Sequence, residues 1–307
     1  WWMNKILRLS KVQAMVLVLA VALVGGLAGL LALLLCHWVL RFGGSDAADK
    51  HGISSAQSVR VGGVLIAVYV LCYLVALYVF EFRFSWQALV MIGGAFGFFA
   101  LGLYEDLFGL LSPRFRLVAM LVMATLIMLL APQLVVTQTG LAGLDWLLTG
   151  QPWLAFICSV LGLVYVVNAF NTADGANGLC SGIGLFALFG LSLVAGAPRE
   201  LLQLEYAVIL ATFIFVLINL SSGRFFLGDG GAYFLGAVVT LCIMRLVGSG
   251  TAPLGQLAVL VAYPVIDLLW SILRRSAAGQ SPFGADNQHL HNRLHARLLA
   301  AGLPAGV

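Results

Sequence analysis

Two adjacent carboxylates, Glu105 and Asp106, interrupt an otherwise apolar stretch of the sequence. Neighbouring acids repel each other unless a cation or a proton separates them, so we expect one of the pair to bind a metal or to stay protonated. An acidic helix end in contact with water is the simpler interpretation of this pair taken alone. Arg114 and Arg116 follow a few residues later, and they could hold a lipid phosphate or anchor a helix at a membrane interface.

A second polar stretch, residues 168–179, carries four side chains spaced three residues apart, namely Asn168, Asn171, Asp174 and Asn177. This spacing predicts one row of polar groups along a tight helical turn. Gly175 and Gly178 within the same stretch would permit backbone bends or the close approach of a ligand. A helix C-cap followed by a turn is the alternative, but a cap needs fewer amides than this segment provides.

A third group of candidates lies towards the C-terminus. Asp229 is surrounded by glycines in residues 226–232, where a carboxylate and free backbone N–H groups could hold a metal-bound phosphate, or where the acid could simply cap a helix. His289 and His291 follow in a polar tail and could neutralise a phosphate or relay a proton, although tail histidines are more often solvated. Lys50 and Arg60, in an earlier polar loop, are phosphate candidates that membrane anchoring explains equally well.

The elements that position these residues are apolar spans. Of the 307 residues 62% are hydrophobic and only 9% are charged, which is typical of a chain solvated by lipid. Windows long enough to cross a hydrocarbon layer of about 30 Å cover residues 12–40, 61–80, 86–104, 115–131, 153–170, 179–197, 206–220, 231–247 and 253–273. The runs are continuous rather than alternating, which favours helices over a barrel. We therefore predict an all-α polytopic bundle of about nine transmembrane helices, forming a single integral membrane domain over residues 1–307.

Counting spans places the polar loops on one side of the membrane. Ten of the 16 Lys and Arg residues fall there: Arg41, Lys50, Arg60, Arg114, Arg116, Arg224, Arg274, Arg275, Arg293 and Arg297. The other six, Lys5, Arg8, Lys11, Arg83, Arg199 and Arg245, fall elsewhere, and the three nearest the N-terminus oppose the assignment. The bias of positive charge towards the cytoplasm predicts that the polar loops face it.

The acids divide in the same way. On the predicted cytoplasmic side lie Asp46, Asp49, Glu105, Asp106, Asp174, Asp229 and Asp286, against Glu81, Asp145, Glu200 and Glu205 on the other side. Asp267 falls inside the last span. Several carboxylates gathered with bases and amides suit a polyphosphate bound to a cation, for which Mg²⁺ is the natural candidate.

In this order the motifs resemble those of the polyprenyl-phosphate N-acetylhexosamine-1-phosphate transferases, or glycosyltransferase family 4. The resemblance covers residues from about 50 to 294. The acidic pair matches Glu105-Asp106, the Asn/Asp-Gly loop matches residues 171–178, the Gly-Asp-x-Gly motif matches residues 228–231, and the histidine motif matches Pro282-Phe283, Asp286, His289 and His291. Three positions depart from the family pattern: Glu105 and Asn177 stand where the family has Asp, and Asn292 where it has His.

The resemblance implies transfer of a sugar 1-phosphate from a UDP-N-acetyl-amino sugar to polyprenyl (undecaprenyl) phosphate, with release of UMP. Such a reaction initiates a lipid-linked cell-envelope glycan, such as O-antigen, at the bacterial inner membrane, with the site facing the cytoplasm. Family members usually continue into at least one more span, so the resemblance implies either that this chain lacks a final span or that it belongs to a shorter subgroup. Partners would be the two substrates and the lipid bilayer, with a homodimer left open and no nucleic acid.

The resemblance also implies a role for each candidate residue. Asp229 and Asp106 would bind Mg²⁺, with Mn²⁺ as the alternative ion. Catalytic groups would be Asp106, Glu105, His289 and His291. The nucleotide sugar would be bound by Asn171, Asp174, Asn177, Lys50 and Arg60. Arg114 and Arg116 would meet the lipid phosphate.

Two other functions are weighed against this one. A CDP-alcohol phosphotransferase also places acids at a membrane face, but its Asp-Gly-x-x-Ala-Arg motif is absent, because Asp174-Gly175 continues as Ala-Asn-Gly-Leu. A transporter would place its ionisable groups near the middle of the bilayer, whereas only Asp267 and Arg245 are expected inside spans.

Overall fold

The computed structural model describes residues 23–32, 34, 60–79, 82–223, 225–281 and 288–301, and within these ranges it is helical with no β-strand. Within the described ranges, seven helical segments are long and apolar enough to cross a membrane: α3 (Gly62–Val79), α4 (Trp86–Phe108), α5 (Pro113–Leu130), α7 (Pro152–Ala173), α9 (Arg199–Ser222), α10 (Gly228–Gly248) and the continuous stretch Leu254–Ala277. The last of these contains α11 (Leu254–Ala258), a 3-10 turn (Val259–Val261) and α12 (Ala262–Ala277). The all-α membrane bundle is thereby confirmed.

Two of the nine predicted windows hold shorter helices in the described part of the chain. These are Leu23–Ala32 and α8 (Leu179–Ser192). The first window lies mostly outside the described residues, so the count of nine stays a prediction. Two further short helices lie outside the membrane windows, α6 (Ala142–Gly150) and α13 (Leu290–Ala300).

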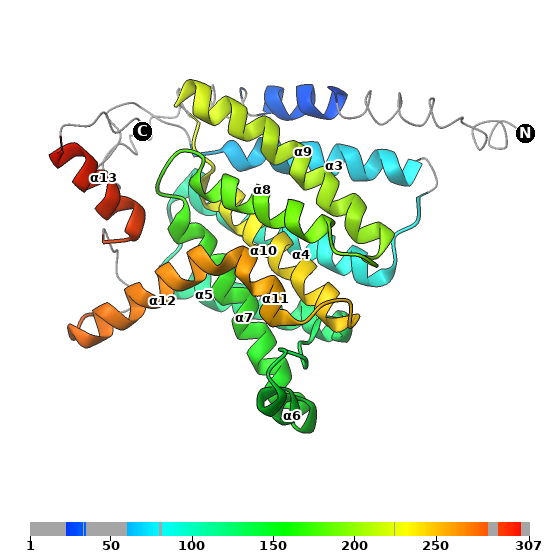
Figure 1. The fold of residues 1–307 in the computed structure, drawn as a ribbon. Helices are drawn as coiled ribbons and strands as arrows, with labels where there is room; N and C mark the ends of the chain where they lie inside the picture. Colours follow the sequence, from blue (N-terminus) through cyan, green and yellow to red (C-terminus); the bar gives the residue numbers. More distant parts are fainter. Residues whose placement is uncertain are drawn as a thin grey trace, which may run out of the picture.

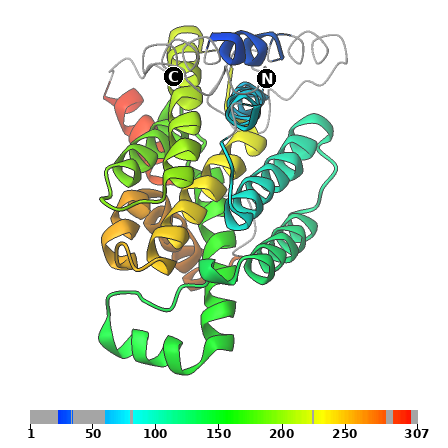
Figure 2. The same ribbon diagram turned by 90° about the vertical axis from the view of Figure 1, so that its right-hand side faces the viewer.

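Helix α10 is the centre of the bundle, and it packs against α3, α4, α7 and α8 (Figures 1 and 2). Of its apolar window, 94% is buried inside the protein, because the helix is hydrophobic or small around its whole circumference. Its first turn lies in backbone contact with two neighbours: a Cβ added at Gly63 would overlap the backbone of Gly231, and one added at Gly102 would overlap that of Asp229. Such close approach between helices requires small residues.

The contact at Gly102 leads to a prediction with a control on the same helix. Gly102→Ala should destabilise the protein by about 1–3 kcal/mol, because the new methyl group meets backbone atoms that cannot rotate away. Gly93→Ala, also in α4, meets nothing within 4 Å and should be neutral or stabilising by up to about 1 kcal/mol. Thermal unfolding of both variants in detergent measures the difference. Equal unfolding temperatures would show that α4 and α10 are not in backbone contact.

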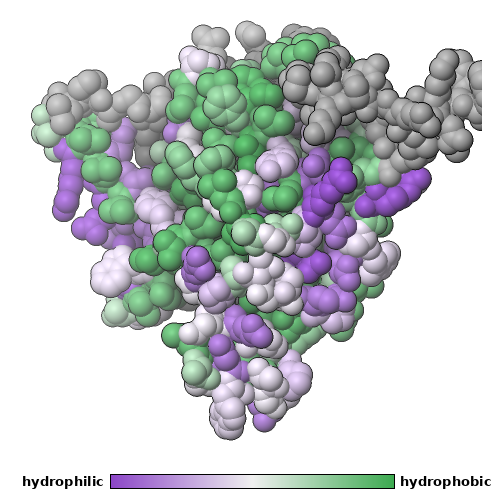
Figure 3. Space-filling model, turned by 45° about the vertical axis from the view of Figure 1, so that its right-hand side comes forward, coloured by the Kyte–Doolittle hydropathy of each residue, from purple (hydrophilic) through white to green (hydrophobic). Residues whose placement is uncertain are grey.

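The outer surface is suited to lipid. Figure 3 shows apolar side chains over much of one face, with hydrophilic ones gathered towards its two sides. Large apolar side chains that are exposed include Leu89, Val118, Val122, Leu126, Phe213 and Leu217. The structure corrects the predicted position of one acid, Glu205, which we expected in an extracytoplasmic loop. Glu205 lies within α9 and is completely buried, because this helix begins at Arg199, earlier than the apolar window predicted.

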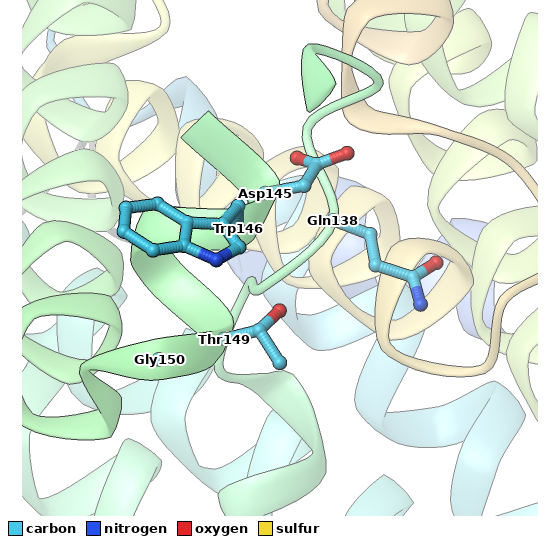
Figure 4. Close-up of a pocket in the computed structure, with 5 residues that line it drawn as sticks. All are labelled: Gln138, Asp145, Trp146, Thr149 and Gly150. Atoms are coloured by element: carbon cyan, nitrogen blue, oxygen red, sulfur yellow. The ribbon is translucent and has the colours of Figure 1, made fainter. Parts of the chain in front are cut away.

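Helix α6 lies at the end of the bundle away from most of the polar loops. Asp145 accepts hydrogen bonds from the hydroxyl of Thr139 (2.6 Å) and from the backbone N–H of Gly140 (3.2 Å), which fix the turn before the helix. A shallow hollow beside it is lined by Gln138, Asp145, Trp146, Thr149 and Gly150 (Figure 4). Helix α7 begins here and runs for 22 residues, or about 33 Å, to Ala173. Its far end lies in the polar stretch of residues 168–179, here called the Asn-rich segment. The hollow is therefore remote from the acidic residues that could do chemistry.

Candidate active site

Asp106 holds the first turn of α10. Its Oδ1 accepts the backbone N–H of Asp229 (2.9 Å) and its Oδ2 accepts that of Gly230 (2.8 Å). The carboxylate lies near the end of α4, and it satisfies N–H groups that have no partner within their own helix. Asp106 therefore joins α4 to the first turn of α10, which contains Asp229.

The side chain of Asp229 lies between basic and acidic neighbours. Its Oδ2 accepts a hydrogen bond from Nη1 of Arg116 at 2.8 Å, and the same guanidinium lies 3.8 Å from Glu105 Oε1. Glu105 in turn accepts the backbone N–H of Leu111 at 2.9 Å, which fixes the turn between α4 and α5. The hydroxyl of Tyr233, one turn along α10, lies beside Arg116. The Asp229 side chain keeps 23% of its surface exposed, so a ligand can reach it.

Asp174 is the third carboxylate of this group. It is the C-cap residue of α7, and its side chain accepts a hydrogen bond from the backbone N–H of Gly228 at 3.1 Å. Burial and the negative charge of Asp229 raise the pKa of Asp174 to about 7, while the bond from Gly228 and the charge of Arg60 act in the opposite direction. Gly228 has a φ of 78°, and a side chain there would overlap the carbonyl of Arg60, so this position requires glycine. Because its pKa is about 7, the Asp174 carboxyl would lose its proton readily when a cation binds beside it.

The Asn-rich segment does not form the single row that its spacing predicts. Helix α7 ends at Ala173, and the following residues turn, so the side chains diverge. Asn168 donates to the Val164 carbonyl within α7, and Asn171 lies beside the Tyr233 hydroxyl. The side chain of Asn177 points to α9, where its Oδ1 accepts Nδ2 of Asn219 at 3.0 Å. Only Asn171 and Asp174 contact groups of α10 in the described structure.

The tail histidines form a second group. Nδ1 of His289 lies 2.8 Å from Asp267 Oδ2, and its ring stacks parallel to that of His291 with centroids 5.8 Å apart. The His291 ring lies against Gly175, next to Asp174, so the tail reaches the Asn-rich segment. Burial and the neighbouring His289 lower the pKa of His291, and the nearby Asp267 partly opposes this. A neutral His291 suits hydrogen bonding better than neutralising phosphate charge.

The remaining candidates are placed as follows. Arg60 lies close enough to act electrostatically on Asp174 and Asp229. Arg116 pairs with Asp229 and Glu105, because the first turn of α5 faces α10, and its contact with a lipid phosphate stays a prediction. Arg114, two residues earlier, is exposed. Lys50, and the tail residues Pro282, Phe283 and Asp286, lie outside the described residues.

Three contributors were not identified from the sequence as site residues. Tyr233 follows Asp229 by four positions, a spacing that places both on one face of α10 and could have drawn attention to it. Asn219 and Asp267 are isolated polar residues in apolar spans, and their partners are distant in sequence. An intramembrane polar residue is itself a signal of function, but it does not reveal the partner.

The donor chemistry of this group fits a hard divalent cation. Among the described residues, no three carboxylate, histidine or cysteine side chains converge to form a metal site on their own. Mg²⁺ does not need such a cage, since it is commonly held by one or two carboxylates, waters and substrate phosphates. Asp229 and Asp106 supply carboxylates of this kind at the N-terminus of a 21-residue helix, whose dipole favours anions.

Comparison with known proteins gives a consistent result. The model of a family described as glycosyl transferase family 4 matches residues 88–247, from α4 to α10. A Bacillus subtilis (strain 168) protein, "Probable undecaprenyl-phosphate N-acetylglucosaminyl 1-phosphate transferase", is 27% identical over 269 residues, which are 84% of this chain and 71% of that protein.

Two further relatives show how widely the similarity extends. The Mycolicibacterium smegmatis "Decaprenyl-phosphate N-acetylglucosaminephosphotransferase" is 26% identical over 324 residues, covering 94% of this chain and 79% of the relative. The Escherichia coli (strain K12) "Undecaprenyl-phosphate alpha-N-acetylglucosaminyl 1-phosphate transferase" is 28% identical over 175 residues, covering 54% of this chain and 47% of the relative. The match to the E. coli protein thus spans about half of its length.

Proposed function

Because this chain belongs to glycosyl transferase family 4, we propose that it transfers a sugar 1-phosphate from a UDP-N-acetyl-amino sugar to polyprenyl phosphate and releases UMP. The observation that carries the proposal is the arrangement at the first turn of α10: Asp106 and Asp174 accept its backbone N–H groups, while the Asp229 side chain pairs with Arg116. The lipid phosphate oxygen would attack the β-phosphorus, and the bond to the bridging oxygen of UMP would break. Reactants and products are anionic, so charge neutralisation and positioning dominate the barrier.

The roles of the residues follow from their contacts. Asp229, with Asp106, would hold Mg²⁺ or Mn²⁺, which when bound would neutralise the diphosphate and the leaving UMP. Arg116 orients the Asp229 carboxylate, and Arg60 adds positive charge beside Asp174. Asn171 and Asp174 both lie against α10, beside Tyr233 and Gly228, and would contact the nucleotide. The names of the relatives specify N-acetylglucosamine, so UDP-N-acetylglucosamine is the first donor to test.

A release assay distinguishes this function from its rivals. Purified protein in detergent, supplied with Mg²⁺, undecaprenyl phosphate and UDP-N-acetylglucosamine, should release UMP only when both substrates are present. Release of CMP from a CDP-alcohol would support the CDP-alcohol reaction instead. Movement of a UDP-sugar into proteoliposomes without UMP release would support a transporter. A panel of UDP-N-acetyl-amino sugars then identifies the donor, and a role in O-antigen synthesis would follow from the preferred sugar.

We also propose that the site faces the cytoplasm of the inner membrane, since UDP-sugars are made there and the Lys/Arg bias agrees. In a variant whose native cysteines are replaced, cysteines at the exposed positions Leu110 and Ser221 should react with an impermeant thiol reagent only after the cells are opened. A cysteine at the exposed Thr149 of α6 is the matched control and should react in intact cells. Labelling of Leu110→Cys in intact cells would show that the site faces away from the cytoplasm.

Asn177, where the family pattern has Asp, provides a test of nucleotide binding. Asn177→Asp keeps the oxygen that accepts from Asn219 but replaces an amide that could read a uracil edge. We expect a change in the KM for the UDP-sugar of about tenfold, equal to about 1.4 kcal/mol, with kcat nearly unchanged. Steady-state kinetics over a range of UDP-sugar concentrations measures both constants. A large change in kcat at constant KM would place Asn177 in the proton or metal machinery.

A further inference from the structure

Asp267 of α12 uses both carboxylate oxygens to hold the start of the tail helix. Its Oδ2 lies 2.8 Å from Nδ1 of His289, and its Oδ1 accepts the backbone N–H of Leu290 at 3.0 Å. The side chains of Asp267 and His289 are only 10% and 9% exposed. This pair joins a membrane span to a segment that comes more than 20 residues later, and it lies outside the matched family region, 88–247.

The geometry fixes where the His289 proton lies. An ionised carboxylate can only accept hydrogen bonds, so Nδ1 of His289 must carry the proton. In the neutral ring, Nε2 is then left without a proton and is free to interact with a ligand. The bond to Leu290 satisfies an N–H of the first turn of α13, where His289 is the N-cap residue and makes no capping bond with its own side chain.

The contact places the tail beside the carboxylate group already described. His291 stacks on His289 and lies against Gly175, the residue after Asp174. Tyr263, four residues before Asp267 on α12, lies beside the backbone of His291. Asp267 of α12 thus holds the beginning of α13 against the loop that follows α7, with Tyr263 of the same helix beside it.

We propose that Asp267 is a positioning residue for phosphate transfer: it sets the tautomer of His289 and the start of α13. The unprotonated Nε2 of His289 can then accept the proton of a substrate phosphate hydroxyl, which leaves the phosphate oxygen with its electron pair for attack and His289 as an imidazolium paired with Asp267. This inference rests on the proposed function. Asp267 does not touch the substrate itself; it acts through His289.

A double-mutant cycle tests whether Asp267 acts through His289. Asp267→Asn keeps the size of the side chain but offers one acceptor and one donor where two acceptors are needed. We expect Asp267→Asn and His289→Gln each to lower kcat by at least about 10²-fold, a typical contribution of a positioned proton-transfer group. The double variant should be no slower than His289→Gln alone, and Asp267→Glu, which keeps the carboxylate, should retain more activity than Asp267→Asn.

Two controls separate positioning from loss of folding. Asp145→Asn changes a similarly bonded acid next to α6 and should leave kcat unchanged. Each variant should also keep the elution profile and unfolding temperature of the wild type. If Asp267→Asn lowers kcat by the same factor in the His289→Gln background, Asp267 does not act through His289 and the inference is overturned.

A spectroscopic measurement tests the tautomer without relying on turnover. In proteoliposomes containing protein labelled with ¹⁵N-histidine, the His289 signal, identified by its loss in His289→Gln, should show a protonated Nδ1 and an unprotonated Nε2. In Asp267→Asn the proton should be redistributed between the two nitrogens. A proton on Nε2 alone in the wild type would overturn the inference. If the wild type releases no UMP, the proposed function fails, while the tautomer can still be measured.

Discussion

Asp229→Asn is expected to abolish sugar-phosphate transfer while leaving the protein folded. The backbone N–H of Asp229, not its side chain, makes the bond to Asp106, so the start of α10 remains capped in the variant. The amide oxygen can still accept from Arg116, but it lacks the charge that would hold a divalent cation. The loss should therefore exceed the roughly 10²-fold typical of one electrostatic donor.

The assay for this variant is Mg²⁺-dependent UMP release, measured beside thermal unfolding. Asp145→Asn serves as the control, because it removes one charge from an acid at the opposite end of α7. The control should keep wild-type activity, and both variants should unfold near the wild-type temperature. Near-normal turnover by Asp229→Asn would show that Asp229 does not bind the cation.

Removal of divalent cations should have an equally large effect. The candidate site offers only a few carboxylates for a cation, so we expect Mg²⁺ to bind weakly until the diphosphate of the substrate completes its coordination. Treatment with a chelator should bring transfer below detection, and added Mg²⁺ or Mn²⁺ should restore it. The unfolding temperature of the substrate-free protein should change little, because weak binding adds little stability.

Full activity in the presence of excess chelator would exclude a cation from the reaction. Binding of Mn²⁺, followed by its paramagnetic signal with and without a UDP-sugar, gives a readout that does not depend on turnover. We expect tight binding only when the nucleotide sugar is present. Tight binding to the Asp229→Asn variant would place the cation elsewhere.

The main features of the fold and the family were predictable from the sequence. Continuous apolar runs predict helices because lipid offers no partners to an open backbone, and the structure confirms this for seven long segments. The four ordered motifs predict the family that the comparison confirms over residues 88–247. Counting spans predicted that Glu105, Asp106 and Asp229 lie on one side of the membrane, and in the structure they are neighbours through Arg116 and the first turn of α10.

The bonding within the site was not predictable, for physical reasons. Whether Asp106 caps α10 depends on how closely α4 approaches it, and that depends on the lack of a side chain at Gly102. The three-residue spacing of the asparagines predicted a common face, but the helix ends at Ala173 and Asn177 turns to Asn219. Asp267 lies in α12 and His289 lies 22 positions later, at the start of α13, so helical spacing within one element does not predict their pairing.

The central claim, that a sugar is transferred together with its phosphate, is tested most directly by following the β-phosphorus. UDP-N-acetylglucosamine labelled with ³²P at the β-phosphate and with ³H in the sugar is incubated with the protein, Mg²⁺ and undecaprenyl phosphate, and the lipid is extracted. We expect both labels to enter the lipid in equal amounts and unlabelled UMP to appear in the aqueous phase. Tritium in the lipid with ³²P remaining in aqueous UDP would mean that the sugar alone is transferred, and would contradict the account.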